Sequence, residues 1–120
     1  MKKSLIYQFR KIDRSYKFAD LFDLEEIQKI QDLFSDATGV ASIITEPDGT
    51  PITKPSNFCS LCKDLIRKSE IGLKNCLLSD YIIGRPSAKG PRIQKCLSGG
   101  LIDAGASIFF NNKQIAIWLV

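Results

Sequence analysis

The stretch LIDAGASIFFNNKQIAIWLV, residues 101–120, decides the fold. Its two halves, Leu101–Phe110 and Lys113–Val120, are rich in the apolar, β-branched and aromatic residues that favour strands. Between them, Asn111-Asn112 can adopt the positive φ values of a tight hairpin turn. The stretch therefore predicts two long antiparallel strands, with Ile117 and Trp118 on opposite faces of the second because strand side chains alternate.

Further strands are predicted upstream of this hairpin. A turn at Ser98-Gly99-Gly100 joins the hairpin to a strand before it, and a turn at Pro47-Asp48-Gly49 separates two short runs that lie earlier in the chain. The sequence therefore predicts a five-stranded antiparallel sheet. Its expected strands are Val40–Thr45, Thr50–Thr53, Arg92–Cys96, Leu101–Phe110 and Lys113–Val120.

Helical signals lie before the first strand and in the middle of the chain. Asp23 followed by Glu26 is a helix-start signature, and Gly39 supplies a left-handed stop. The expected helices are Leu24–Ala37, Phe58–Lys68 and Ser69–Gly84. The expected inward stripe of the last helix is Leu73, Cys76, Leu77, Tyr81 and Gly84. The order of elements predicts an α+β fold in which helices cover one face of a single sheet.

The chain is expected to form one domain with one core, because it has 120 residues of which 44% are hydrophobic. Residues 1–17 are predominantly basic and are expected to be a helical lead-in outside the core, used for dimerisation or signal relay. The domain is expected to span residues 18–120. Because the apolar strand Lys113–Val120 has no polar tail, we expect the domain to be truncated at its C-terminus.

The composition excludes several kinds of site. The chain has no histidine, which excludes cysteine–histidine pairs, serine–histidine–aspartate triads and histidine-ligated metals. No constellation of nucleophile, base and orienting group is found, so we expect no enzymatic activity. The net charge of +4 comes without interleaved aromatic residues or a DNA-reading motif, so we expect no direct nucleic-acid binding. No run approaches the roughly 18 apolar residues that cross a bilayer, and no signal stretch is found, so a soluble cytoplasmic domain is expected.

The residues most able to bind a ligand or a metal, or to react, are the four cysteines and two carboxylates, Asp80 and Asp103. The thiols have three interpretations: buried, reduced side chains that act as small hydrophobes, the lining of a ligand pocket, or a metal or redox module. In the last interpretation, zinc or an iron–sulfur cluster would be held by Cys59, Cys62, Cys76 and Cys96. Asp80 is interpreted as an exposed residue of a helix or a polar contact for a ligand. Asp103, which lies in an apolar strand, is interpreted as an edge-facing side chain.

Residues 18–120 resemble a known family. The segments that carry the resemblance are Phe18-Ala19-Asp20-Leu21, Phe34-Ser35-Asp36-Ala37-Thr38-Gly39, Asp48-Gly49-Thr50-Pro51-Ile52-Thr53, Ser56-Asn57-Phe58-Cys59, Cys76-Leu77-Leu78-Ser79-Asp80 and Lys95-Cys96-Leu97-Ser98-Gly99-Gly100-Leu101-Ile102-Asp103. Together they are similar to the PocR-type sensory domain. Cys59, Cys76 and Cys96 fall on the cysteine positions of that family.

The resemblance implies a PAS-like sheet and a sensor of small organic molecules such as simple hydrocarbon derivatives and diols. Domains of this family precede histidine kinase, PAS or DNA-binding output modules. The implied partners are therefore a small ligand and an output domain in the same chain, in a signal-transduction protein such as a sensor histidine kinase or a transcriptional regulator. The resemblance implies no catalytic activity and no required cofactor.

The predicted inward faces place a ligand pocket between the sheet and the helices. Apolar and thiol side chains are expected to line it, with Asn57 or Asp80 as polar contacts. The expected ligand-binding residues are Asn57, Phe58, Cys59, Leu73, Cys76, Asp80, Tyr81, Cys96, Ala104 and Ala106. Such a lining favours a small, mostly apolar molecule with one or two polar groups.

Overall fold

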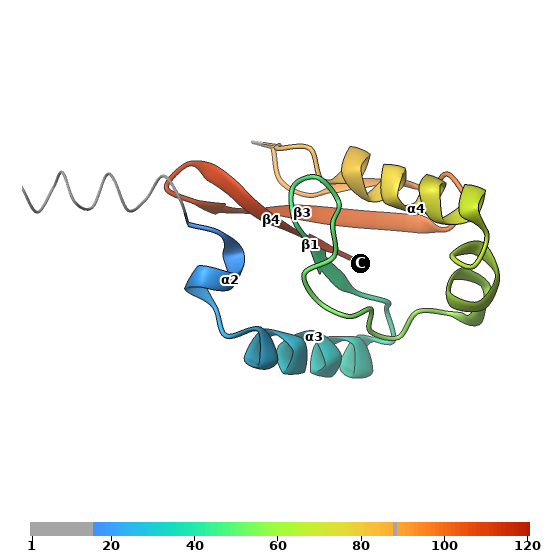
Figure 1. The fold of residues 1–120 in the computed structure, drawn as a ribbon, viewed down its shortest axis with the longest axis horizontal. Helices are drawn as coiled ribbons and strands as arrows, with labels where there is room; N and C mark the ends of the chain where they lie inside the picture. Colours follow the sequence, from blue (N-terminus) through green and yellow to red (C-terminus); the bar gives the residue numbers. More distant parts are fainter. Residues whose placement is uncertain (1–15, 88) are drawn as a thin grey trace, which may run out of the picture.

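The computed structural model describes residues 16–87 and 89–120 (Figure 1). Its elements are α2 (Phe18–Leu21), α3 (Leu24–Thr38), β1 (Ile43–Thr45), η1 (Leu61–Ile66), α4 (Glu70–Ile83), β2 (Arg92–Lys95), β3 (Ile102–Phe110) and β4 (Lys113–Leu119). Of the predicted lead-in at residues 1–17, all but Tyr16 and Lys17 lie outside the described residues. Among the described helices, none is both long and apolar enough to cross a bilayer.

The sheet is antiparallel and has the strand order β1-β4-β3-β2. It has four strands, so the prediction of five is wrong. The predicted strand Thr50–Thr53 makes only an isolated bridge between Pro51 and Thr45. Proline has no backbone N–H to donate to a ladder, and the Ile44 N–H is taken by the Thr53 hydroxyl oxygen at 2.9 Å. This segment therefore follows β1 as a loop. Side-chain and backbone hydrogen bonds hold it there, and the N–H groups of Ile52 and Thr53 both donate to the Ile44 carbonyl oxygen, at 2.8 and 3.2 Å.

The β3–β4 hairpin confirms the interpretation of the C-terminal stretch. Asn111 and Asn112 have φ values of 49° and 63°, as a tight hairpin turn requires. Further upstream, Gly100 has a φ of 67°, and the Cys96 N–H donates to the Leu101 carbonyl at 2.7 Å across the turn. Both turns therefore form where the sequence predicts them.

The helix α3 begins and ends where its caps predict. The Asp23 side chain accepts a hydrogen bond from the Glu25 N–H at 2.9 Å, and Gly39 is left-handed with a φ of 75°. In the middle of α3, Gln31 is fully buried. Its side-chain amide reaches the carbonyl oxygens of Ser42 at 3.0 Å and Lys54 at 2.8 Å. This contact fixes the loop that follows β1 against α3.

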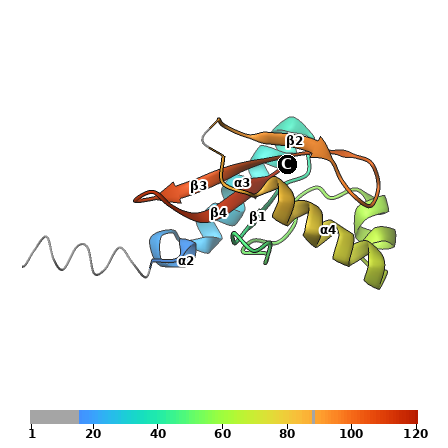
Figure 2. The ribbon, with the colours of Figure 1, turned by 90° about the horizontal axis from the view of Figure 1, so that it is seen from above.

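Helices cover both faces of the sheet, so the prediction that they cover one face is wrong. On one face, Ile44 and Ala116 pack with Ile27 of α3, and Trp118 lies edge-on to Phe34 of α3 at 5.5 Å between ring centroids. Successive strand residues point to opposite faces, and the side chains of Ile43, Ile117 and Leu119 pack instead with Ile83 of α4. Figure 1 shows the sheet between α3, at the bottom of the view, and α4, at the upper right. Figure 2, turned by 90°, shows β2 beside β3 and α4 running obliquely to them.

The predicted helix Phe58–Lys68 is shorter than expected and is wound differently. Its regular part, η1, is a π-helical turn in which the Arg67 N–H donates to the Cys62 carbonyl oxygen at 2.9 Å. In an α-helix, residues five apart point about 140° away from each other. The wider π turn brings Cys62 and Arg67 to the same side of the segment, and both line the cavity described below.

Candidate functional site

A cavity of about 390 Å³ lies on the α4 side of the sheet, where β4 ends and β3 begins. All four cysteines border it. Its lining residues are Gly39, Val40, Ala41, Ser42, Ile43, Asn57, Phe58, Cys59, Cys62, Arg67, Cys76, Ser79, Asp80, Cys96, Leu101, Ile102, Asp103, Leu119 and Val120. The cavity is therefore built from the C-terminal end of α3, the segment around η1, one side of α4 and one end of the sheet.

Local backbone geometry brings the segment Asn57–Cys59 to the cavity wall. Asn57 has a positive φ of 52°, a conformation that asparagine tolerates better than most residues. Its side-chain amide donates to the Gly39 carbonyl oxygen at 2.8 Å. This bond ties the wall of the cavity to the C-terminal end of α3.

The side of α4 that faces the cavity differs from the predicted stripe. Cys76, Ser79 and Asp80 line the cavity, whereas Leu73 and Tyr81 are 38% and 45% exposed and do not. The predicted stripe followed the helical spacing of apolar and small side chains along this segment. Ser79 and Asp80 can face inward because each has a partner: the Ser79 hydroxyl accepts from the Leu97 N–H at 2.8 Å, and Asp80 pairs with Arg67.

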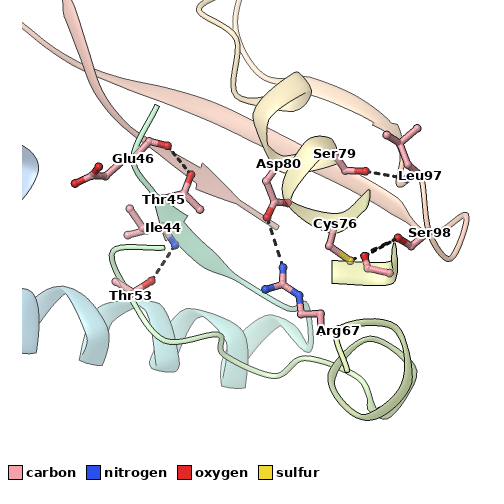
Figure 3. Close-up of polar contacts among 11 residues, drawn as sticks. Ile44, Thr45, Glu46, Thr53, Arg67, Cys76, Ser79, Asp80, Leu97 and Ser98 are labelled. Carbon is pink, nitrogen blue, oxygen red and sulfur yellow. Dashed lines mark hydrogen bonds and ion pairs between the residues drawn. The ribbon is translucent and has the colours of Figure 1, made fainter. Parts of the chain in front are cut away.

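Arg67 and Asp80 form the polar centre of the cavity. An Arg67 terminal nitrogen and an Asp80 carboxylate oxygen lie 3.5 Å apart, and Figure 3 shows the two side chains pointing toward each other. The Arg67 guanidinium also lies over the Phe58 ring, 4.8 Å from its centroid. Its Nε atom is buried and has no hydrogen-bond partner in the described part of the chain. This N–H is therefore an unsatisfied buried donor in the cavity wall.

Burial raises the pKa values of the two carboxyl groups at this centre. It raises the pKa of Asp80 to about 6, and the attraction of Arg67 offsets only part of that effect. Burial also raises the pKa of Asp103, again against the opposing effect of Arg67. The two carboxyls repel each other enough to raise the pKa of Asp80 further. Two carboxyl groups therefore lie close to a single guanidinium in a partly buried site.

The strand β3 presents Asp103 to the cavity, and the interpretation of Asp103 as an edge-facing side chain is wrong. Gly105 lies on the same face, because a β-carbon added there would be 2.4 Å from a methyl of Ile83 in α4. Alternation then places Ala104 and Ala106 on the opposite face, and Ala106 is paired in register with Trp118 of the α3 side. The expectation that Ala104 and Ala106 line the pocket is therefore wrong.

The four thiols differ in their surroundings. The sulfurs of Cys59 and Cys62 lie 3.5 Å apart, the Cys76 thiol lies 3.7 Å from the Ser98 hydroxyl (Figure 3), and the Cys96 sulfur accepts from the Gly99 N–H at 3.2 Å. Hydrogen bonds from the backbone and thiol of Cys62 lower the pKa of Cys59. Burial, together with the neighbouring thiols, raises the pKa of Cys62 to about 11.

The alternative of a metal held by Cys59, Cys62, Cys76 and Cys96 finds no support in this geometry. Within residues 16–87 and 89–120, no group of three or more cysteine or acidic side chains converges in a way that could hold a metal ion. Four free thiols border one cavity, but their sulfurs are not arranged as a ligand set.

Six of the ten residues expected to bind a ligand lie on the cavity wall: Asn57, Phe58, Cys59, Cys76, Asp80 and Cys96. The sequence reasoning missed Arg67, Ser79 and Asp103 as wall residues. For Asp103 a signal was available, since it alternates with Gly105 and Ser107 on a face whose small residues leave room for a packed helix. The sequence contains no pattern that places Arg67 on the cavity wall, because its position depends on the π-helical winding of η1.

Comparison with known proteins identifies the family of this chain. The family model described as the sensory domain found in PocR matches residues 20–120. The chain belongs to the PocR sensory-domain family. The match confirms the resemblance, and the PocR domain contains every residue of the cavity wall. No curated protein and no solved structure matches the chain.

Proposed function

We propose that the cavity of this PocR domain binds a small, mostly apolar organic compound and that binding is the input of a signal-transduction protein. The sensory-domain match gives the general role. The observation that carries the specific proposal is the cavity itself, whose walls combine apolar side chains and thiols with a single polar centre at Arg67, Asp80 and Asp103. A volume of about 390 Å³ is at the small end of the range for ligand sites.

The polar centre indicates the groups that the ligand carries. The Arg67 guanidinium, which lines the cavity, can donate a hydrogen bond to a ligand hydroxyl or carbonyl oxygen. The Asp80 carboxyl, whose pKa is about 6, accepts a hydrogen bond when it is ionised and donates one when it is protonated. We therefore propose alcohols, diols and aldehydes of a few carbon atoms as the ligand class, with their hydrocarbon part against Ile43, Phe58 and Leu119.

The proposed role in the parent protein is to bias an output domain in the same chain, in a histidine kinase or a transcriptional regulator. As a sensor, the domain itself has no catalytic role. We propose that the sheet is related to that of PAS domains. The position of the last strand, β4, next to the first, β1, supports this relation. We also propose that residues 1–17 relay the signal or form a dimer contact, and that the domain works in the cytoplasm, where thiols stay reduced.

A thermal-shift screen of short alcohols, diols, aldehydes, carboxylates and amines tests the proposal. A ligand at about ten times its dissociation constant adds roughly 1.4 kcal/mol to the free energy of unfolding, which raises the melting midpoint by several degrees. We expect such a rise with members of the first three classes. We expect it to be lost in Asp80→Asn and Arg67→Met, which remove the polar contacts.

Two matched variants serve as controls. Asp36→Asn changes an exposed carboxylate of α3, and Lys68→Met changes the exposed cation beside Arg67. Both should keep the wild-type ligand response. The proposal is wrong if no compound shifts the wild-type midpoint, or if the shifts persist unchanged in Asp80→Asn and Arg67→Met.

A further inference from the structure

We propose that Cys59 and Cys62 form a site of reversible oxidative modification, at which a low-molecular-weight disulfide of the glutathione class converts the two thiols into a protein disulfide. Cys59 lies just before η1 and Cys62 lies within it, and both residues border the cavity. The proposal does not depend on whether the cavity binds an organic ligand, because it concerns the chemistry of the thiols themselves.

The sulfur atoms of Cys59 and Cys62 lie close enough to form a disulfide after a small movement. The two sulfurs lie 3.5 Å apart, and a disulfide bond requires about 2.05 Å. Side-chain rotation of the partly exposed pair can supply most of the remaining movement, since Cys59 is exposed and lies before the first residue of η1. Among the described residues, no other two cysteine thiols are joined by a hydrogen bond.

The second support is the asymmetry of the pair. Cys59 is exposed, and the hydrogen bonds that it accepts favour its thiolate, which is the nucleophilic form. Cys62 is half-buried in the cavity wall, where burial keeps it protonated. A disulfide in solution can therefore reach Cys59 first. The Cys62 sulfur lies 3.5 Å from the Cys59 sulfur and supplies the second thiol.

The oxidation of the two thiols then proceeds in two thiol–disulfide exchange steps. The Cys59 thiolate attacks one sulfur of glutathione disulfide, which forms a mixed disulfide and releases one glutathione thiolate. That thiolate takes the proton of Cys62, and the Cys62 sulfur attacks the Cys59 sulfur and expels the second glutathione. The protein loses two hydrogen atoms, which are two protons and two electrons. One glutathione disulfide becomes two glutathione thiols when the second glutathione thiolate takes up the proton that Cys59 released.

The sequence allows a direct assignment of any disulfide that forms. Trypsin cleaves after lysine and arginine but not before proline, so Lys54-Pro55 and Arg85-Pro86 stay intact. Cys59 and Cys62 then fall together in peptide 30–63, Cys76 in peptide 75–89 and Cys96 in peptide 96–113. A Cys59–Cys62 disulfide stays within one peptide, whereas every other pairing links two peptides.

The experiment equilibrates the reduced full chain in glutathione buffers of increasing oxidation, traps free thiols by alkylation and maps the tryptic peptides by mass spectrometry. We expect peptide 30–63 to lose two hydrogen atoms and its two alkylation sites together, and to recover both after reduction. The proposal is overturned if peptide 30–63 keeps two alkylated thiols in every buffer. It is also overturned if linked peptides containing Cys76 or Cys96 form first.

Three variants separate the roles of the two thiols. In Cys62→Ser, glutathione should remain attached to residue 59, because no second thiol can release it. In Cys59→Ser, peptide 30–63 should react with glutathione disulfide at least tenfold more slowly than in the wild type. The matched control Cys76→Ser/Cys96→Ser should form the disulfide as the wild type does, and failure of this control to do so would show that the pair does not act alone.

Discussion

At the scale of single residues, Asp80 is the group whose protonation matters most. It lies in the cavity wall, where Arg67 at 3.5 Å is its one cationic partner in the described part of the chain, and Asp103 nearby adds a second negative charge. A buried ion pair gains little net stability, because desolvation of both ions opposes their attraction. Asp80 therefore adds little to the stability of the fold, which agrees with the role in ligand recognition that we propose for it.

The raised pKa of Asp80 predicts that the domain loses stability as the pH rises. The folded protein binds the proton up to about pH 6, whereas an ordinary carboxyl releases it near 3.8. The stabilising effect is therefore complete below the lower value and is lost as the pH rises through the upper one, and it amounts to about 3 kcal/mol. Urea unfolding between about pH 4 and pH 7 should show this decline in the wild type.

The Asp80→Asn variant is the critical comparison for this prediction. Without a titrating group at position 80, the free energy of unfolding should change much less over the same pH range, with a smaller decline left from Asp103. Asp36→Asn should decline like the wild type, since that carboxylate is exposed on α3. An equal decline in wild type and Asp80→Asn would show that Asp80 titrates normally.

At the scale of elements, the buried Gln31 holds α3 to the loop after β1. Its amide nitrogen lies within hydrogen-bonding distance of the Ser42 and Lys54 carbonyls and of the Ser56 hydroxyl, and its oxygen accepts from the Thr53 hydroxyl. The loop then continues directly into the cavity wall at Asn57. This one side chain thus couples α3 to the candidate site.

The Gln31→Ala variant should lower the free energy of unfolding by about 2–4 kcal/mol, because it opens a gap and leaves buried polar groups without partners. Gln28→Ala is the matched control, since Gln28 also bonds to Lys54 but from a more exposed position. Its effect should stay below about 1 kcal/mol. Chemical denaturation of both variants gives the comparison, and equal losses would contradict the special role of Gln31.

The elements also show how far sequence reasoning reaches. The caps of α3 and the Asn111-Asn112 hairpin are local signals, so their positions were predicted to within a residue. The π-helical winding of η1 and the inward placement of Asp80 depend on tertiary contacts. A polar residue faces inward only when another part of the chain supplies its partner, and here that partner is Arg67. Of the predicted ligand-binding residues, the thiols therefore lie on the cavity wall, whereas the apolar members on α4 and β3 do not.

At the scale of the whole molecule, Gly105 allows α4 to lie close against the sheet. A β-carbon at that position would be 2.4 Å from a methyl of Ile83 and 3.0 Å from a methyl of Leu119. Both are core residues on the α4 side. The cavity lies beside this contact, so its shape depends on how closely α4 approaches β3.

The Gly105→Ala variant should therefore lower the free energy of unfolding by about 1–3 kcal/mol, because the core has no room for the added methyl group. Gly99→Ala is a suitable control: its nearest neighbour would be the terminal methyl of Ile66 at 3.1 Å, in an exposed turn. That change should stay within about 0.5 kcal/mol. Thermal unfolding followed by circular dichroism measures both, and a stable Gly105→Ala protein would show that α4 can move away freely.

The contact between Trp118 and α3 has an optical consequence. Trp118 is the only tryptophan of the chain. Its indole N–H donates to the Ser42 hydroxyl, and its ring lies against Phe34. The next residue, Leu119, lines the cavity. All tryptophan emission therefore comes from the α3 side of the sheet, one residue from the cavity wall. If a compound that binds the cavity moves β1 and β4 relative to α3, the emission maximum should shift at saturation, and it should not shift in Asp80→Asn. A compound that stabilises the domain and leaves the emission spectrum unchanged would show that α3 does not respond to the cavity.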